Sequence, residues 1–152
     1  MAFNRNILAY KFLIAMFSVS VWITKAIYEM RLEGLVLEQQ MQRETPFGEP
    51  SAPLMIGRYA NKTVAFLPRH GEHHTIPPHL INYRANIWAF HQLGVEQILA
   101  VASVGGITEP YMPGTIALPD QLIDYSWGRD SSFASEDFSA DKHIDFTYPF
   151  DE

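Results

Sequence analysis

The chain has 152 residues, enough for one modest domain with a core of its own. Apolar residues make up 47% of it and charged residues 18%, a balance that excludes an intrinsically disordered chain. The net charge of −6 argues against non-specific binding of nucleic acid, and the absence of cysteine excludes disulfides, thiolate nucleophiles and cysteine-based zinc sites.

An uncharged and mainly apolar stretch runs from Phe12 to Thr24. It is shorter than the ~20 apolar residues that a membrane-spanning helix needs. Arg5 and Lys11 precede it as in a signal peptide, but no small-residue cleavage site follows. The sequence therefore predicts an apolar N-terminal helix. Two interpretations stay open, a buried or adherent helix and a weak membrane contact through residues 7–28.

A strand followed by a helix is predicted next. Thr63–Leu67 is an apolar run of strand length, and Pro68 ends it. Pro77 and Pro78 suit the entrance of a helix, where a missing N–H costs nothing. Gly94 is expected to cap the C-terminus of this helix. Apolar residues recur at three- and four-residue steps and predict one buried stripe, formed by Leu80, Tyr83, Ile87 and Phe90.

Two further strands are predicted at Gln97–Ala102 and Thr115–Leu118. The first of them is almost continuously apolar, as is typical of a parallel sheet that is covered on both faces. Strand, helix and strand in this order predict a right-handed βαβ unit, so the expected fold class is α/β.

Charged and flexible residues follow two of these strands. Arg69, His70 and Gly71 come after the first strand, and residues 103–106 (SVGG) come after the second. Ligands of open α/β sheets bind beyond the carboxyl ends of strands. An arginine fork matches two phosphate oxygens, and an imidazole adds a group whose charge responds near neutral pH. The pattern predicts an anion site, with a surface ion pair between Arg69 and Glu72 as the alternative.

Other polar residues favour structural roles. Four histidines lie close together in the sequence but match no zinc-binding spacing, so we expect no metal; they are His70, His73, His74 and His79. Arg84 and Asn86 lie on the predicted helix. A solvated face, or a hydrogen bond to a neighbouring loop, is expected for them rather than catalysis.

Several strings of the sequence belong together. They are residues 66–74 (FLPRHGEHH), 82–89 (NYRANIWA), 101–106 (VASVGG) and 119–124 (PDQLID). In this order they resemble the methylthioadenosine phosphorylase family, among the purine nucleoside phosphorylases. Three more are most similar to its bacterial S-methyl-5'-thioinosine phosphorylases, namely residues 44–51 (ETPFGEPS), 124–129 (DYSWGR) and 143–147 (HIDFT). The resemblance extends from about Leu32 to the last residue.

The resemblance implies an enzyme that splits a purine nucleoside with inorganic phosphate. S-methyl-5'-thioinosine or methylthioadenosine would give the purine base and 5-methylthioribose 1-phosphate. Phosphate is then a co-substrate, and neither a cofactor nor a metal is expected. The family resemblance also implies a cytoplasmic homo-trimer, with membrane association through the N-terminal segment as the alternative location.

The same resemblance assigns the site residues. It implies that phosphate is bound by Arg69, His70, Ala102 and Ser103. His74 would lie close to the sugar, and His143 would reach the neighbouring subunit's site near the 5'-thio group. The aspartate that protonates the leaving purine is expected beyond Glu152, so no catalytic residue is assigned.

Two departures from the family pattern affect these expectations. Residues 1–31 stand where the family has a strand and a Gly-Gly-Thr-Gly loop, so we expect an incomplete phosphorylase-type sheet in residues 32–152 and an apolar helix in place of the first strand. Family members also continue past Glu152. A chain of this extent would bind phosphate without turning over nucleoside, and an inactive fragment or an interaction module is the alternative to an active enzyme.

A strand followed by Arg-His-Gly-Glu also resembles the histidine phosphatases, in which the histidine is itself phosphorylated. Those enzymes carry the motif near the start of the domain and need a second catalytic histidine deep in the chain. They give no role to residues 82–89 or 103–106. The sequence therefore disfavours this second enzyme class.

Overall fold

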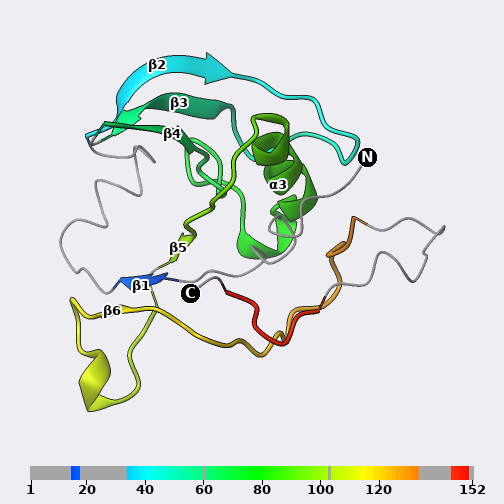
Figure 1. Cartoon of the computed structure of the whole chain (residues 1–152). Coiled ribbons are helices and arrows are strands. Elements are labelled where there is room, and N and C mark those ends of the chain that lie inside the picture. Colours follow the sequence, from blue (N-terminus) through cyan, green and yellow to red (C-terminus); the bar gives the residue numbers. More distant parts are fainter. Residues whose placement is uncertain (1–14, 18–33, 60, 103, 134–144, 151–152) are drawn as a thin grey trace. The chain divides into compact units, whose positions relative to one another are not determined.

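The computed structural model describes residues 15–17, 34–59, 61–102, 104–133 and 145–150 (Figure 1). The chain divides into two compact units. The helical unit comprises Ile23–Val95 and Arg129–Phe133, and the short-strand unit comprises Met1–Trp22, Glu96–Gly128 and Ala134–Glu152.

A three-stranded antiparallel sheet belongs to the helical unit (Figure 1). Its strands are β2 (Val36–Met41), β3 (Leu54–Tyr59) and β4 (Lys62–Phe66), in the order β2-β3-β4. β4 lies within one residue of the first predicted strand, which is thus confirmed. Its antiparallel neighbours β3 and β2 were not predicted.

A glycine fixes the close approach of β2 and β3. Gly57 lies opposite Leu37, next to a register shift between Leu37 and Gln39. A Cβ atom at Gly57 would overlap the Val36 carbonyl oxygen. The strands can therefore pair at this bulge because residue 57 has no side chain.

Helix α3 (Tyr83–Gln92) is capped at both ends by its own sequence. At its start the Asn82 side chain accepts a hydrogen bond from the Ala85 N–H at 3.1 Å. At its end Gly94 has a φ of 72°, and the Gly94 and Val95 N–H groups donate to the His91 and Phe90 carbonyls. The predicted C-cap is confirmed. The two prolines instead precede the helix, at the 3-10 turn η2 (Pro78–Leu80).

The buried face of α3 differs from the predicted stripe. Ala85 and Ala89 are fully buried and Asn86 is 5% exposed, whereas Leu80 is 65% exposed. The predicted stripe was wrong for two reasons. Leu80 precedes α3, and Tyr83, Ile87 and Phe90 share a face of the helix that is only half-buried. Small side chains on the buried face let the helix approach its neighbours closely. The apolar core consists of Ala52, Leu54, Ile81, Ala85 and Ala89.

The short-strand unit contains a second sheet, in the order β5-β1-β6. β1 (Ala15–Phe17) pairs in parallel with β5 (Val101–Ala102) and antiparallel with β6 (Ile116–Ala117). A 3-10 turn, η3 (Glu109–Tyr111), separates β5 from β6. Both predicted strands of this region are present, but each is confined to two residues.

The expected N-terminal helix is corrected here. Ala15–Phe17 lie inside the expected N-terminal helix yet form a strand, and the rest of residues 1–31 lies outside the described residues. The predicted βαβ unit would join β4 to β5, which lie in different units of the chain, so it stays a prediction. The fold is mixed α/β.

Candidate functional site

The loop after β4 carries the residues that the sequence singled out. It turns sharply, because the Gly71 N–H donates to the Pro68 carbonyl at 2.9 Å. Gly71 has a φ of 81°, a backbone conformation that favours glycine. A Cβ atom there would also lie 3.4 Å from the Ile76 side chain. The turn thus brings Arg69 and His70 to the end of the strand in a fixed backbone geometry.

His70 and Ile76 are joined twice across this loop. The Ile76 N–H donates to the His70 carbonyl, and the His70 ring Nδ1 donates to the Ile76 carbonyl, both at 2.9 Å. The His70 ring is half-buried. Burial lowers the pKa of His70, and the charges of Arg69 and His74 act in the same direction, while the bond to Ile76 opposes them. The ring is therefore held neutral and in one orientation near neutral pH.

His74 lies beside His70 in the same loop. Their ring centroids are 4.6 Å apart, with the planes tilted by 40°. The backbone of His74 adopts a φ of 53°, which is uncommon for a residue with a side chain. Such conformations concentrate at functional sites, where the surrounding structure imposes them. The structure thus brings together the predicted residues His70 and His74, and Arg69 adjoins them.

Glu72, the carboxylate that the sequence offered as an alternative partner of Arg69, forms a hydrogen bond with a residue of another strand. The Glu72 carboxylate accepts a hydrogen bond from the Gln40 side chain of β2 at 3.2 Å. This bond ties the loop to the sheet, and no feature of the sequence predicted it. The half-buried Arg69 places its positive charge next to His70.

Of the other predicted site residues, the structure describes only Ala102. It ends β5 in the short-strand unit and is half-buried, whereas Ser103 and His143 lie outside the described residues. Gly106 packs against the 3-10 turn η3, because a Cβ atom there would overlap the Tyr111 carbonyl oxygen, whereas a Cβ atom at Gly105 would meet no atom within 4 Å. This packing accounts for the small residue at position 106.

Neither a metal site nor a membrane span is found in the part of the chain that the structure describes. Its histidines and carboxylates form no group of three or more that could hold a metal ion. Within the same residues, no helix is both long enough and apolar enough to cross a membrane.

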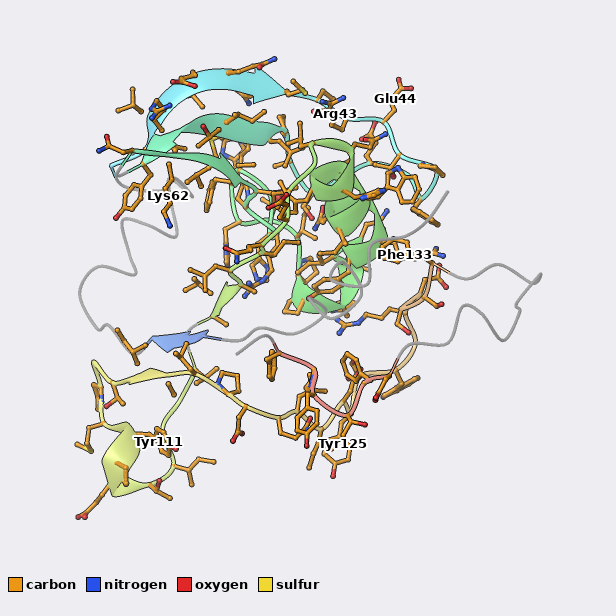
Figure 2. The ribbon with its side chains drawn as sticks, in the orientation of Figure 1. Arg43, Glu44, Lys62, Tyr111, Tyr125 and Phe133 are labelled. Atoms are coloured by element: carbon orange, nitrogen blue, oxygen red, sulfur yellow. The ribbon has the colours of Figure 1, made fainter. Side chains whose placement is uncertain are left out.

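Two asparagines, in α3 and at its N-cap, form hydrogen bonds with the loop that contains Phe47 and Ser51, which was assigned no function from the sequence. Asn86 bonds twice to Ser51, and the Asn82 Nδ2 donates to the Phe47 carbonyl at 2.7 Å. The ring of Phe47 also meets Phe133, which lies beside α3 in Figure 2, at a centroid distance of 5.2 Å. The structural role expected for Asn86 is confirmed.

A pocket of about 220 Å³ opens at the N-terminal end of α3, next to this loop. Two arginines line it, and both are engaged within the protein. Arg84 pairs with Asp130 and stacks on the Phe47 ring at 5.0 Å, and Arg129 stacks on the Tyr83 ring at 4.5 Å. The pocket wall is therefore built from paired charges and aromatic faces, which suits a structural rather than a catalytic role.

Comparison with known proteins places these motifs in context. A family model described as the phosphorylase superfamily matches residues 29–152. A probable S-methyl-5'-thioinosine phosphorylase of Pseudomonas syringae pv. tomato is 48% identical over 122 residues, covering 80% of this chain and 50% of the relative. An S-methyl-5'-thioadenosine phosphorylase of Hyperthermus butylicus is 51% identical over 108 residues, covering 71% of this chain and 39% of that relative.

A solved structure extends the similarity to the fold. An adenosine/methylthioadenosine phosphorylase from Schistosoma mansoni, a single-residue mutant in its apo form, aligns with a TM-score of 0.69 and 29% identity. The alignment covers 92% of this chain and 47% of that one. The chain thus spans about half the length of the relatives it matches.

Proposed function

The chain belongs to the phosphorylase superfamily, and from this membership we propose that its whole protein is a methylthio nucleoside phosphorylase. Such an enzyme is a pentosyltransferase of purine salvage. It splits S-methyl-5'-thioinosine or S-methyl-5'-thioadenosine with inorganic phosphate into the purine base and 5-methylthioribose 1-phosphate. Support comes from the relatives of 48% and 51% identity, which are named for these two nucleosides.

The observation that carries the proposal is the geometry of the loop after β4. Arg69 offers a planar fork that matches two oxygens of a phosphate. His70 is fixed beside it by the bond from its ring Nδ1 to the Ile76 carbonyl. Gly71 allows the sharp turn that presents both side chains at the end of the strand. These features suit a bound inorganic anion.

The reaction uses that anion as its nucleophile. A phosphate oxygen forms a bond to the anomeric carbon of the sugar as the carbon–nitrogen bond to the purine breaks. The electron pair of the broken bond leaves with the purine, which takes up a proton, and the sugar becomes positively charged in between. A phosphate held by Arg69 and His70 stabilises this charge, because fixed charges in a site need no reorganisation during the reaction. His74, next to His70, would face the sugar.

The residues assigned by the resemblance alone remain part of the proposal. These are Ala102, Ser103 and His143, of which the last would act in the site of a neighbouring subunit. We place the enzyme in the cytoplasm as a homo-trimer that needs neither a metal nor an organic cofactor. An inactive fragment or an interaction module is the alternative for this 152-residue chain.

Two measurements on the purified chain test the proposal. Purine release from S-methyl-5'-thioinosine and phosphate is followed by chromatography, and phosphate binding is followed by the rise in melting temperature that a ligand of the folded state produces. Arg69→Gln is expected to weaken phosphate binding by ~10-fold or more, since it removes a charged, two-pronged contact. Arg58→Gln, an exposed arginine on β3, is the matched control and should bind phosphate as the parent does.

The outcomes separate the enzyme from the fragment. Purine release that requires Arg69 supports the enzyme proposal for this chain. Phosphate binding that requires Arg69, without purine release, supports the site and the fragment alternative. A chain that is folded but unaffected by phosphate refutes the assignment of Arg69 and His70.

A further inference from the structure

We propose that the loop after β4 selects an anion that carries its own proton, with His70 Nε2 accepting the hydrogen bond from the O–H group of hydrogen phosphate. This inference rests on the proposed function, since it concerns the phosphate of that site. It goes beyond that function by assigning the protonation state of the bound ion and the atom, His70 Nε2, that accepts a hydrogen bond from its O–H group.

The geometry of the His70 ring gives the first step. A backbone carbonyl oxygen can only accept a hydrogen bond, so the contact of Nδ1 with the Ile76 carbonyl at 2.9 Å places the ring proton on Nδ1. In a neutral imidazole the other nitrogen then has a lone pair and accepts. Nε2 is therefore an acceptor as long as His70 stays neutral.

The surroundings of His70 keep it neutral. The ring is half-buried, and burial is the main cause that lowers the pKa of His70. The titratable groups that act on the ring are Arg69 and His74, and each disfavours a second positive charge. The nearby carboxylate of Glu72 is bonded to the neutral Gln40 amide of β2. Near neutral pH the site thus combines a permanent donor, Arg69, with a permanent acceptor, His70 Nε2.

An acceptor next to an anion site discriminates between ions of the same shape and charge. Hydrogen phosphate has three bare oxygens for the Arg69 fork and one O–H group for Nε2. Sulfate has the same tetrahedral shape and charge but no proton near neutral pH, so one of its oxygens would face the lone pair of Nε2. Arg69 attracts both ions equally, so the difference in affinity between hydrogen phosphate and sulfate comes from His70.

Isothermal titration of the chain with sodium phosphate and with sodium sulfate tests the inference. At about pH 8, well above the ordinary pKa of histidine, we expect phosphate to bind at least ~10-fold more tightly than sulfate. As the pH falls through the lowered pKa of His70, the imidazole gains a proton on Nε2, which then donates. Sulfate binding should therefore strengthen on acidification, and the preference for phosphate should shrink.

A pair of variants assigns the effect to the ring. His70→Gln places an amide at this position, which can donate as well as accept at any pH, so the preference should be lost at about pH 8. His73→Gln, an exposed neighbour outside the His70–His74 stack, is the control and should keep the preference.

The results distinguish failure of the inference from failure of the function. Equal binding of both ions by the parent chain at about pH 8 overturns the inference and leaves the phosphate site standing. An unchanged preference in His70→Gln also overturns it. If neither ion binds to the folded chain, both the site assignment and the inference fall.

Discussion

The Asn86 side chain holds Ser51 at two points. Its Oδ1 accepts a hydrogen bond from the Ser51 N–H at 2.7 Å, and its Nδ2 donates to the Ser51 hydroxyl at 3.0 Å. Asn86 is 5% exposed and Ser51 is half-buried, so both bonds are largely shielded from water. This contact anchors the segment before β3 to α3 and fixes the sheet and the helix relative to each other within that unit.

Substitution of Asn86 should destabilise the chain more than substitution of its partner. Asn86→Ala leaves the Ser51 N–H without its acceptor in a buried place, which costs about 1–3 kcal/mol of unfolding free energy. Ser51→Ala keeps that backbone bond and loses only the hydroxyl contact, so about 1 kcal/mol is expected. Urea unfolding of both variants measures the difference. Equal stability of Asn86→Ala and the parent would show that this contact is dispensable.

Two substitutions at Asn82 separate its two roles. Asn82→Ala removes the helix cap and should cost about 1 kcal/mol. Asn82→Asp keeps an oxygen for the Ala85 N–H and adds a negative charge that suits a helix N-terminus. It loses the donor to the Phe47 carbonyl, so the loop should loosen while the helix stays capped. Hydrogen exchange at the Ala85 amide should therefore be fast in Asn82→Ala and slow in Asn82→Asp, and the opposite order would contradict the cap.

Two glycines should respond differently to alanine. Gly57→Ala forces a methyl group against the Val36 carbonyl, where both groups belong to paired backbones, and roughly 3 kcal/mol is expected. Gly94→Ala meets no atom within 4 Å, so its cost is the φ of 72° alone, about 1–2 kcal/mol. Thermal unfolding compares the two. A Gly57→Ala variant as stable as Gly94→Ala would argue against the β2–β3 register.

The stability of the chain should depend on pH through His70. Its pKa is lowered in the folded state, so the unfolded chain binds more protons as the pH falls below about 6.5. The stabilising contribution is complete above that pH and is lost as the pH falls toward the folded-state pKa. Between about pH 7.5 and 5.5, the melting temperature of the parent should fall more steeply than that of His70→Gln.

A second titrating group leaves that comparison intact. Hydrogen bonds from the Thr147 hydroxyl and N–H lower the pKa of Asp145, whose ordinary value already lies in the acidic range. The contribution of Asp145 to stability is lost at a lower pH than that of His70. The parent chain and His70→Gln both retain it, so it does not affect their difference. His73→Gln is again the control and should keep the parent slope. Parallel pH profiles for the parent and His70→Gln would contradict the shifted pKa.

Local sequence features predicted part of the fold well. The strand before Pro68 and the cap at Gly94 were confirmed, because both depend on backbone sterics within a few residues. The buried stripe of α3 was misplaced, because the neighbours of a helix decide which of its faces is buried, and here that face carries Ala85, Asn86 and Ala89. The family resemblance, carried by strings such as residues 66–74, was also confirmed.

The sequence by itself determined the order of residues in the loop after β4, namely an arginine, a histidine and a glycine at the end of a strand. The tertiary structure decided which strands pair, since any strand offers the same N–H and C=O groups to a neighbour and only packing selects among them. It also decided the chemistry of His70. Its proton position and its pKa are set by the Ile76 carbonyl and by burial, and both exist only in the folded chain.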